Sequence, residues 1–185
     1  MTVYLIRHGK TRGNVEHRYI GRTDQPLCPQ GRAELQSKIG PEADRVLASP
    51  LLRCRETAAI LYPGKGMEIV DDLRETDFGE FENHTYEELK DDPRYRAWLD
   101  SAGATAPPGG ESKAAQQERT VRAFRGIVEM CRENERVALV VHGGTIMCLL
   151  EALEPSRRFY DWQAPNGGGY ACAWDGARLT VAGAL

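Results

Sequence analysis

Two short apolar runs, each ending directly at a histidine, constrain this fold more than any other feature of the chain. Residues 3–6 lead into Arg7-His8-Gly9, and residues 137–141 lead into His142-Gly143-Gly144. Short apolar runs of this kind are typical of buried strands in a parallel sheet. In such sheets the carboxyl ends of the strands share one edge, and ligands bind there. We therefore expect His8 and His142 to face the same ligand.

Strand and helix signals alternate along the rest of the chain, which favours an α/β fold. Strands are predicted at residues 2–6, 45–48, 68–70 and 137–141, with a closing hairpin of residues 170–174 and 178–181. Helices are predicted at residues 30–38, 50–61, 111–133 and 145–153. Ser49 resembles an N-cap with Pro50 at the first helical position. The order of elements predicts a three-layer α/β/α sandwich with a mainly parallel, doubly wound sheet.

The length of the chain suits one domain. A chain of 185 residues can bury one core, so we expect a single domain over residues 1–185. The sequence is more polar after the strand predicted at residues 68–70, with short helices expected around residues 86–89 and 94–99. We predict that roughly residues 71–110 form a polar insertion over the sheet edge that carries the histidines, which would be the active-site edge.

The composition limits the partners and the compartment. A net charge of −3 argues against non-specific binding to nucleic acid or to an acidic membrane surface, and no apolar stretch is long enough to span a membrane. The five cysteines form no C-x-x-C pair, and the first strand starts almost at once. We therefore expect no signal peptide, reduced thiols and a cytoplasmic location. No His-Glu-x-x-His or EF-hand pattern is present, so no metal is expected.

Anion chemistry at His8 is the interpretation that these residue types favour. A single histidine at a strand end is more often a hydrogen-bonded structural residue than a nucleophile, but two such ends with arginine and glycine beside them favour function. A neutral imidazole can attack phosphorus when cations neutralise the phosphoryl oxygens. Arg7 supplies one cation, and Arg53 or Arg55 supplies a second, since spacing alone does not choose between them. The glycines before the last predicted helix let its backbone approach an anion.

Four segments resemble, in their order along the chain, the motifs of the histidine phosphatase superfamily, also called phosphoglycerate-mutase-like. They are residues 5–9 with Thr11 and Asn14, residues 49–58, residues 73–75 with 78–82, and residues 141–144. Four ordered motifs that run through nearly the whole chain are far more specific than any one of them. The resemblance implies the phosphoglycerate-mutase-like fold and a reaction through phosphohistidine.

The resemblance also implies a role for each matching residue. His8 would be the nucleophile, while Arg7, Arg53 and a charged His142 would hold the phosphoryl group. Glu75 would protonate the leaving oxygen and then activate water. The chemistry of the residues alone does not distinguish Glu75 from four neighbouring acids, Asp72, Asp77, Glu80 and Glu82. No cofactor is implied.

Further residues would contact the substrate. Asn14 and the backbone at Gly143 would add hydrogen bonds to the phosphoryl group. Two segments look most like the α-ribazole phosphatase branch of the family, residues 19–27 and 107–112. Arg22 and Thr23, which lie in the first of these segments, are predicted substrate contacts.

Four other side chains are left with open interpretations. Tyr86 or Trp98 forms an aromatic wall for a base or belongs to the core. Two residues depart from the family pattern: Lys10 replaces a common glutamate, and Asn83 stands where a glycine often follows. Neither departure touches the inferred chemical core.

We therefore expect a phosphomonoester hydrolase that acts through phosphohistidine on a small phosphorylated metabolite, with α-ribazole 5′-phosphate of cobalamin biosynthesis as one candidate. A cofactor-dependent phosphoglycerate mutase is the alternative enzyme. Mutases of this family tend to be longer, so we expect an open pocket and hydrolysis. A non-catalytic phospholigand-binding protein on the same fold is the alternative of a different class. The sequence does not decide between a monomer and a homodimer.

Overall fold

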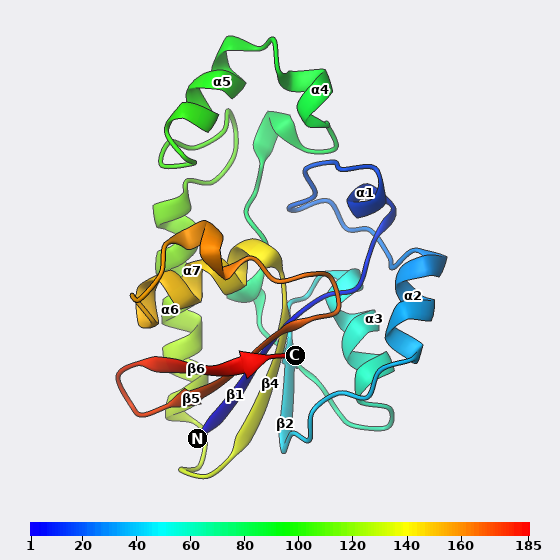
Figure 1. Cartoon of the computed structure of the whole chain (residues 1–185), viewed down its shortest axis with the longest axis vertical. Helices are drawn as coiled ribbons and strands as arrows, with labels where there is room; N and C mark the ends of the chain where they lie inside the picture. The colour runs from blue at the N-terminus through cyan, green and yellow to red at the C-terminus, as the bar shows by residue number, and fades with distance from the viewer.

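Six strands form one sheet in the computed structural model, which describes residues 1–185 (Figure 1). They are β1 (Thr2–Arg7), β2 (Arg45–Ala48), β3 (Glu68–Ile69), β4 (Arg136–Val141), β5 (Gly169–Trp174) and β6 (Leu179–Ala184), in the order β3-β2-β4-β1-β5-β6. The first four run parallel, β5 is antiparallel to β1, and β6 is antiparallel to β5. The predicted mainly parallel sheet and the closing hairpin are confirmed.

Helices connect the strands and cover both faces of the sheet. The α-helices are α1 (Arg12–Val15), α2 (Pro29–Gln36), α3 (Leu52–Leu61), α4 (Tyr86–Leu89), α5 (Pro93–Asp100), α6 (Lys113–Glu129) and α7 (Gly143–Leu153). Short 3₁₀ helices follow as η1 (Asp71–Leu73), η2 (Gly79–Phe81) and η3 (Phe159–Trp162). Figure 1 shows α6 and α7 on one side of the sheet and α2 and α3 on the other. The predicted three-layer α/β/α sandwich is confirmed.

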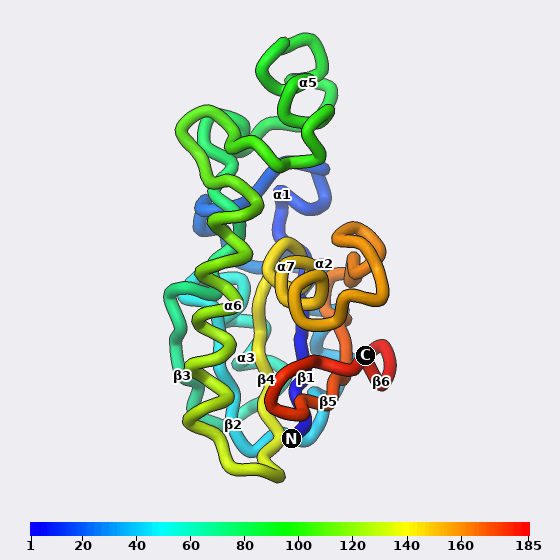
Figure 2. Tube along the Cα trace, turned by 90° about the vertical axis from the view of Figure 1, so that its left-hand side faces the viewer, coloured from blue at the N-terminus to red at the C-terminus, as the bar shows by residue number.

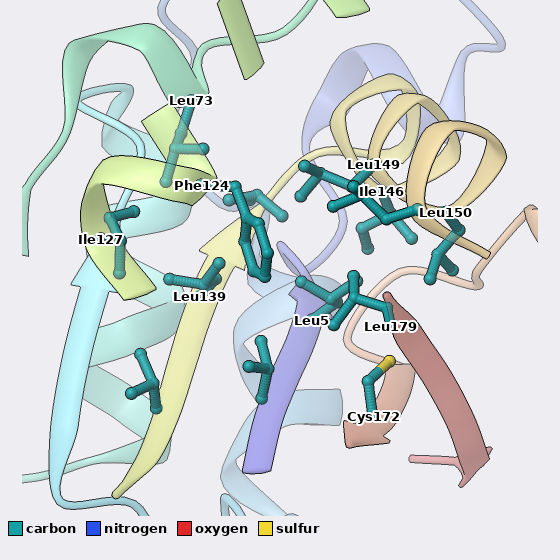
Figure 3. Close-up of a cluster of buried hydrophobic side chains, with 14 of the residues drawn as sticks. Leu5, Leu73, Phe124, Ile127, Leu139, Ile146, Leu149, Leu150, Cys172 and Leu179 are labelled. Carbon is teal, nitrogen blue, oxygen red and sulfur yellow. The ribbon is translucent and has the colours of Figure 1, made fainter. Parts of the chain in front are cut away.

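Alternation along the central strands divides their apolar side chains between two cores. On one face, Leu5 of β1 and Leu139 of β4 pack against Phe124 of α6 and against Ile146 and Leu149 of α7 (Figure 3). All five side chains are fully buried. Figure 2 views the molecule from this α6 and α7 side.

The second core lies on the opposite face. Ile6 of β1 and Val140 of β4 pack there with Leu35 of α2 and with Cys54 and Ala58 of α3. Strands β1 and β4 are therefore held between two apolar cores, which fixes the positions of the residues that follow them.

Residues 71–110 lie largely beyond the end of the sheet at which β1 and β4 finish (Figures 1 and 2). They carry a small core of their own, formed by Phe81, Leu89 and Tyr95. Trp98 is partly buried and packs against this core together with Tyr19. Tyr86 is exposed.

Helices α2, α3, α6 and α7 each differ from the prediction by a few residues at one or both ends. Helix α6 ends at Glu129 and not at residue 133, because Glu135 accepts a hydrogen bond from the amide of Arg132 (2.9 Å) and closes a separate turn. Helix α7 begins at Gly143, two residues earlier than predicted, so its first N–H groups follow His142 directly. No helix in the structure combines the length and the apolar character needed to cross a lipid bilayer.

Candidate active site

The two histidines meet because β1 and β4 are neighbours that end at the same level. The register pairs Arg7 with Val141, and the next residues are His8 and His142. Their ring centroids lie 5.2 Å apart. Strand β2 flanks β4 on its other side and delivers the chain that leads to Arg53 at the start of α3. This is the point where the strand order reverses, and open α/β sheets bind ligands at such points.

Arg53 lies between the two imidazoles and fixes how both are protonated. Its Nε atom is 3.3 Å from Nε2 of His8 and 3.3 Å from Nδ1 of His142. A guanidinium only donates, so both of these imidazole nitrogens carry a lone pair. Nδ1 of His8 then donates to the Gly9 carbonyl (2.7 Å), which leaves the lone pair of the ring on Nε2.

The structure chooses Arg53 over Arg55 as the second cation. Arg53 is fully buried, whereas Arg55 is exposed on the outer side of α3. The Nη atoms of Arg53 donate to the carbonyls of Thr23 (2.9 Å) and Gly21 (2.8 Å). Both Nη atoms of Arg53 are therefore bound to the loop that precedes α2. The remaining nitrogen, Nε, is the one that faces His8.

Ser49 does not cap a helix, which corrects the predicted start of α3. The helix begins at Leu52 with Leu51 as its N-cap residue, and no side chain caps it. The Ser49 hydroxyl instead accepts a hydrogen bond from Nε2 of His142 (2.7 Å). Because Nδ1 of His142 faces Arg53, this contact completes the neutral imidazole. Sequence reasoning missed this role, since a serine before a proline also signals a helix start.

Arg7 presents a buried donor with no partner. Its Nη1 atom donates to the Ala164 carbonyl (2.7 Å), while its Nε atom is buried and makes no hydrogen bond. Buried N–H groups are rarely left unpaired in folded proteins. An orphaned guanidinium donor at the sheet edge that carries His8 suits an anionic ligand.

Burial and nearby cations keep both histidines neutral. Desolvation, with Arg53 as the next cause, lowers the pKa of His8 and of His142 well below the usual 6.5. His8 therefore retains the lone pair on Nε2 at neutral pH. A charged His142 that holds a phosphoryl group stays a prediction, whereas without a bound anion burial and Arg53 favour the neutral ring.

These shifts predict a loss of stability in mild acid. An unfolded histidine takes up a proton near pH 6.5, whereas each buried one does so only at a much lower pH. Between those values the unfolded chain binds more protons. Above about pH 6.5 the free energy of unfolding has its full value. On acidification below that pH it falls by up to about 1.4 kcal/mol per pH unit for each histidine.

Urea denaturation between about pH 7.5 and 5.5 measures how steeply the free energy of unfolding changes with pH. His142→Gln is expected to remove about half of this pH dependence, because one of the two buried titrating groups is gone. His17→Gln is the matched control, since His17 is exposed. A stability that stays constant over this pH range would contradict the prediction.

The carboxylate of Glu75 is held at the same edge by three N–H donors. Its Oε2 atom accepts from the amide of Gly144 at the start of α7 (3.0 Å). Its Oε1 atom accepts from the amide of Thr76 (2.9 Å) and from Nε2 of Gln116 on α6 (3.0 Å). Glu75 is therefore tied to the helix that starts directly after His142.

The other four acids are engaged elsewhere. Asp72 pairs with Arg122, Asp77 with Arg22 and Glu80 with Arg94, all on partly or fully exposed surfaces. Glu82 accepts hydrogen bonds from the amides of Gly21 and Arg22 and from the Thr23 hydroxyl. These contacts make Glu82 the organiser of the loop that Arg53 also holds. Among the five candidates, Glu75 alone contacts the N-terminus of α7.

Two helix residues that sequence reasoning missed position the segment that carries Glu75. Arg119 of α6 donates to the carbonyls of Arg74 (2.8 Å) and Glu75 (3.1 Å) and pairs with Glu111. Thr145 of α7 donates to the Arg74 carbonyl (3.3 Å). No local sequence signal indicates these contacts, because each joins residues far apart in the chain.

The predicted substrate contacts lie around this centre at different depths. Gly143 is the first residue of α7, and a Cβ built there would lie 3.4 Å from the Arg7 guanidinium. The Asn14 amide oxygen accepts from Asn166, which also donates to the His8 carbonyl. Asn14 can therefore still donate through its amide nitrogen.

Arg22 and Thr23 lie on the loop that Arg53 holds, between α1 and α2. The guanidinium of Arg22 is exposed and pairs with Asp77 (3.2 Å). The hydroxyl of Thr23 donates to Glu82 (2.7 Å), and its carbonyl accepts from Arg53. Arg22 is the one of the two whose side chain is open to solvent.

The two departures from the family pattern have local explanations. Lys10 pairs with Glu34 of α2 (2.8 Å), away from the histidines. Asn83 has a φ of 63°, a left-handed conformation that glycine adopts freely and asparagine tolerates. No group of three or more His, Cys, Asp or Glu side chains is arranged to hold a metal ion.

Known proteins match this chain over nearly its whole length. A relative described as probable phosphoglycerate mutase GpmB, from Enterobacter sp. (strain 638), is 33% identical over 165 residues, covering 83% of this chain and 74% of the relative. The crystal structure of phosphoglycerate mutase from Thermus thermophilus is 34% identical with a TM-score of 0.77, covering 98% of this chain and 97% of that chain. The crystal structure of the α-ribazole phosphatase from Shigella flexneri is 25% identical with a TM-score of 0.85, covering 98% and 94%.

The family that the motifs resemble is confirmed by a direct match. Residues 3–183 match the family described as histidine phosphatase superfamily (branch 1). That span includes every residue of the site described above. This chain therefore belongs to branch 1 of the histidine phosphatase superfamily.

Proposed function

We propose that the protein is a phosphomonoester hydrolase that transfers the phosphoryl group of a small metabolite to His8 and then to water. The observation that carries the proposal is the Nε2 lone pair of His8, which faces the Nε–H of Arg53 at 3.3 Å. The unpartnered Nε–H of Arg7 adds a second donor for the phosphoryl oxygens. Nucleophile and cations are thus arranged before substrate binds, which lowers the cost of stabilising transition-state charge.

The first step forms phosphohistidine. Nε2 of His8 attacks phosphorus, the bond from phosphorus to the ester oxygen breaks, and Glu75 in its acid form gives that oxygen a proton. A phosphoryl oxygen takes the place of the His8 lone pair as the acceptor from Arg53. The imidazole becomes cationic as the P–N bond forms, while Nδ1–H remains bonded to the Gly9 carbonyl.

The second step releases inorganic phosphate. Glu75, now a carboxylate, takes a proton from water as the water oxygen attacks phosphorus. The P–N bond breaks and its electron pair returns to Nε2 of His8. The cycle therefore returns Glu75 to its acid form and His8 to its neutral form.

Gly144→Ala is expected to lower the rate about 10²-fold without lowering stability. A Cβ at residue 144 would lie 2.3 Å from Oε1 of Glu75, so this flexible carboxyl must move away. Relative to glycine, alanine at a helical position raises the free energy of unfolding by up to about 1 kcal/mol, which offsets the local strain. Steady-state hydrolysis and urea denaturation measure the two effects.

Gly126→Ala is the matched control for that variant. Gly126 lies inside α6, and a Cβ there meets nothing within 4 Å. We expect it to raise the free energy of unfolding by about 1 kcal/mol and to leave hydrolysis unchanged. A Gly144→Ala enzyme of normal activity would show that the position of Glu75 is not critical.

We propose α-ribazole 5′-phosphate as the first substrate to test. The likeness to the Shigella flexneri α-ribazole phosphatase, with its TM-score of 0.85, supports this choice. A panel of phosphomonoesters that includes this compound, 3-phosphoglycerate and sugar phosphates, ranked by kcat/KM, tests it. A rank in the lower half of the panel would remove α-ribazole 5′-phosphate as the substrate.

Phosphoglycerate mutase activity is the second candidate. The 34% identity to the Thermus thermophilus phosphoglycerate mutase favours it. Both activities would use phosphohistidine, and they differ in whether the phosphoryl group passes to water or back to a phosphoglycerate. Incubation with 3-phosphoglycerate and a bisphosphoglycerate primer separates them, since sustained isomerisation without phosphate release would favour the mutase. Phosphate binding with neither reaction would indicate a non-catalytic protein.

A further inference from the structure

Gln116 is a buried amide that faces Glu75 and that the mechanism above does not use. It lies in the first turn of α6 and is 1% exposed. Its Nε2 atom donates to Oε1 of Glu75 at 3.0 Å, and its Oε1 atom accepts from the hydroxyl of Thr76 and from Sγ of Cys148 (3.5 Å). The reverse orientation of the amide would bring two oxygen atoms face to face, so these contacts define one orientation.

The hydrogen bonds of Glu75 leave one acceptor position open. A carboxylate offers about four lone-pair positions, two on each oxygen. On Oε1, the amide of Thr76 fills one and Nε2 of Gln116 fills the other. The Thr76 hydroxyl lies 3.5 Å from the same oxygen but gives its single proton to the much nearer Oε1 of Gln116. On Oε2, the amide of Gly144 fills one, so the remaining position is on that oxygen.

We propose that Gln116 is a positioning residue that closes Oε1 and thereby directs every proton transfer of Glu75 to Oε2. This inference rests on the proposed function of Glu75 as acid and base. In the first step the Oε2–H bond breaks as the proton passes to the leaving oxygen, and in the second step Oε2 takes a proton from water. Without Gln116, one position on Oε1 is open, and the carboxyl can carry its proton on the oxygen that faces away from the substrate.

The test compares two leaving groups in a Gln116→Met enzyme, which keeps the side-chain volume and removes both hydrogen-bonding atoms. p-Nitrophenolate leaves without being protonated, whereas an alkoxide needs an acid. We expect kcat/KM for a primary alkyl phosphate to fall about 10- to 100-fold, with kcat carrying the loss. For p-nitrophenyl phosphate we expect less than about a threefold change.

Two controls separate this role from a structural one. Gln117→Met changes the adjacent glutamine, which bonds Glu151 and the Cys148 carbonyl outside the site, and is expected to leave the ratio of the two rates unchanged. Thr76→Ser keeps the hydroxyl that orients Gln116 and is expected to retain the wild-type ratio.

Thr76→Val removes that hydroxyl and is expected to lower the alkyl phosphate rate in the same direction as Gln116→Met. It also tests the inference if the methionine variant does not fold.

Equal losses on both substrates, or no loss on either, would overturn the role of Gln116. Hydrogen exchange of the Gln116 side-chain amide, followed by NMR, tests the contact without using activity. Its protons are expected to be protected in the wild type and to lose protection in Glu75→Ala, while those of Gln117 do not change. Rapid exchange in the wild type would overturn the inference. A wild-type enzyme that hydrolyses neither substrate would refute the proposed function, and the exchange measurement still decides the contact.

Discussion

Replacing His8 with asparagine is expected to abolish phosphate release and acid-labile labelling of the protein by a ³²P-labelled substrate. The loss in kcat/KM is expected to reach at least about 10⁴-fold, because the substitution removes the Nε2 lone pair that attacks phosphorus in the proposed reaction. His142 is not expected to replace it, since its Nε2 atom donates to Ser49 and its Nδ1 lone pair accepts from Arg53. The asparagine amide nitrogen can replace Nδ1 as the donor to the Gly9 carbonyl.

Labelling is measured by rapid quench and gel autoradiography, with acid treatment to show a phosphoramidate. His17→Asn is the matched control, because His17 is exposed and asparagine tolerates its left-handed backbone with φ of 55°. We expect full labelling and full activity in that variant. Label that persists in His8→Asn would assign the nucleophile to another residue.

Replacing Arg53 with methionine is expected to lower both activity and stability. The reaction loses the cation that contacts His8, which is expected to cost about 10²- to 10³-fold in kcat. The fold loses the donors to three backbone carbonyls, those of Ile20, Gly21 and Thr23. Buried acceptors left without donors are expected to lower the free energy of unfolding by about 3–5 kcal/mol.

Arg55→Met is the matched control, because it removes another arginine of the same helix. Arg55 is two residues further along α3 and is exposed, so its loss is expected to change the free energy of unfolding by less than about 0.5 kcal/mol. Urea denaturation and steady-state hydrolysis of both variants give the comparison. Equal effects of the two substitutions would contradict the buried role that the structure gives Arg53.

Much of the fold could be predicted from local sequence patterns. The strand at residues 45–48 and the strands that end before His8 and His142 follow from short apolar runs, and the amphipathic spacing of Phe124 and Ile127 predicts α6. Helix starts were less predictable. Ser49-Pro50 carries a helix-start signal, yet the Ser49 hydroxyl bonds His142, 93 residues away, and α3 begins later.

The sequence by itself determined that two histidines leave parallel strands at one edge, because strand ends are encoded by a few neighbouring residues and parallel strands share their carboxyl edge. Only the tertiary structure decided between Arg53 and Arg55. It also showed that Glu75, and none of its neighbouring acids, contacts the start of α7, and it placed Gln116 against that carboxylate. Those choices depend on hydrogen bonds between residues far apart in the chain, such as the 3.0 Å contact from Gly144 to Glu75. No local pattern encodes such contacts, because they exist only after two helices have packed on the sheet.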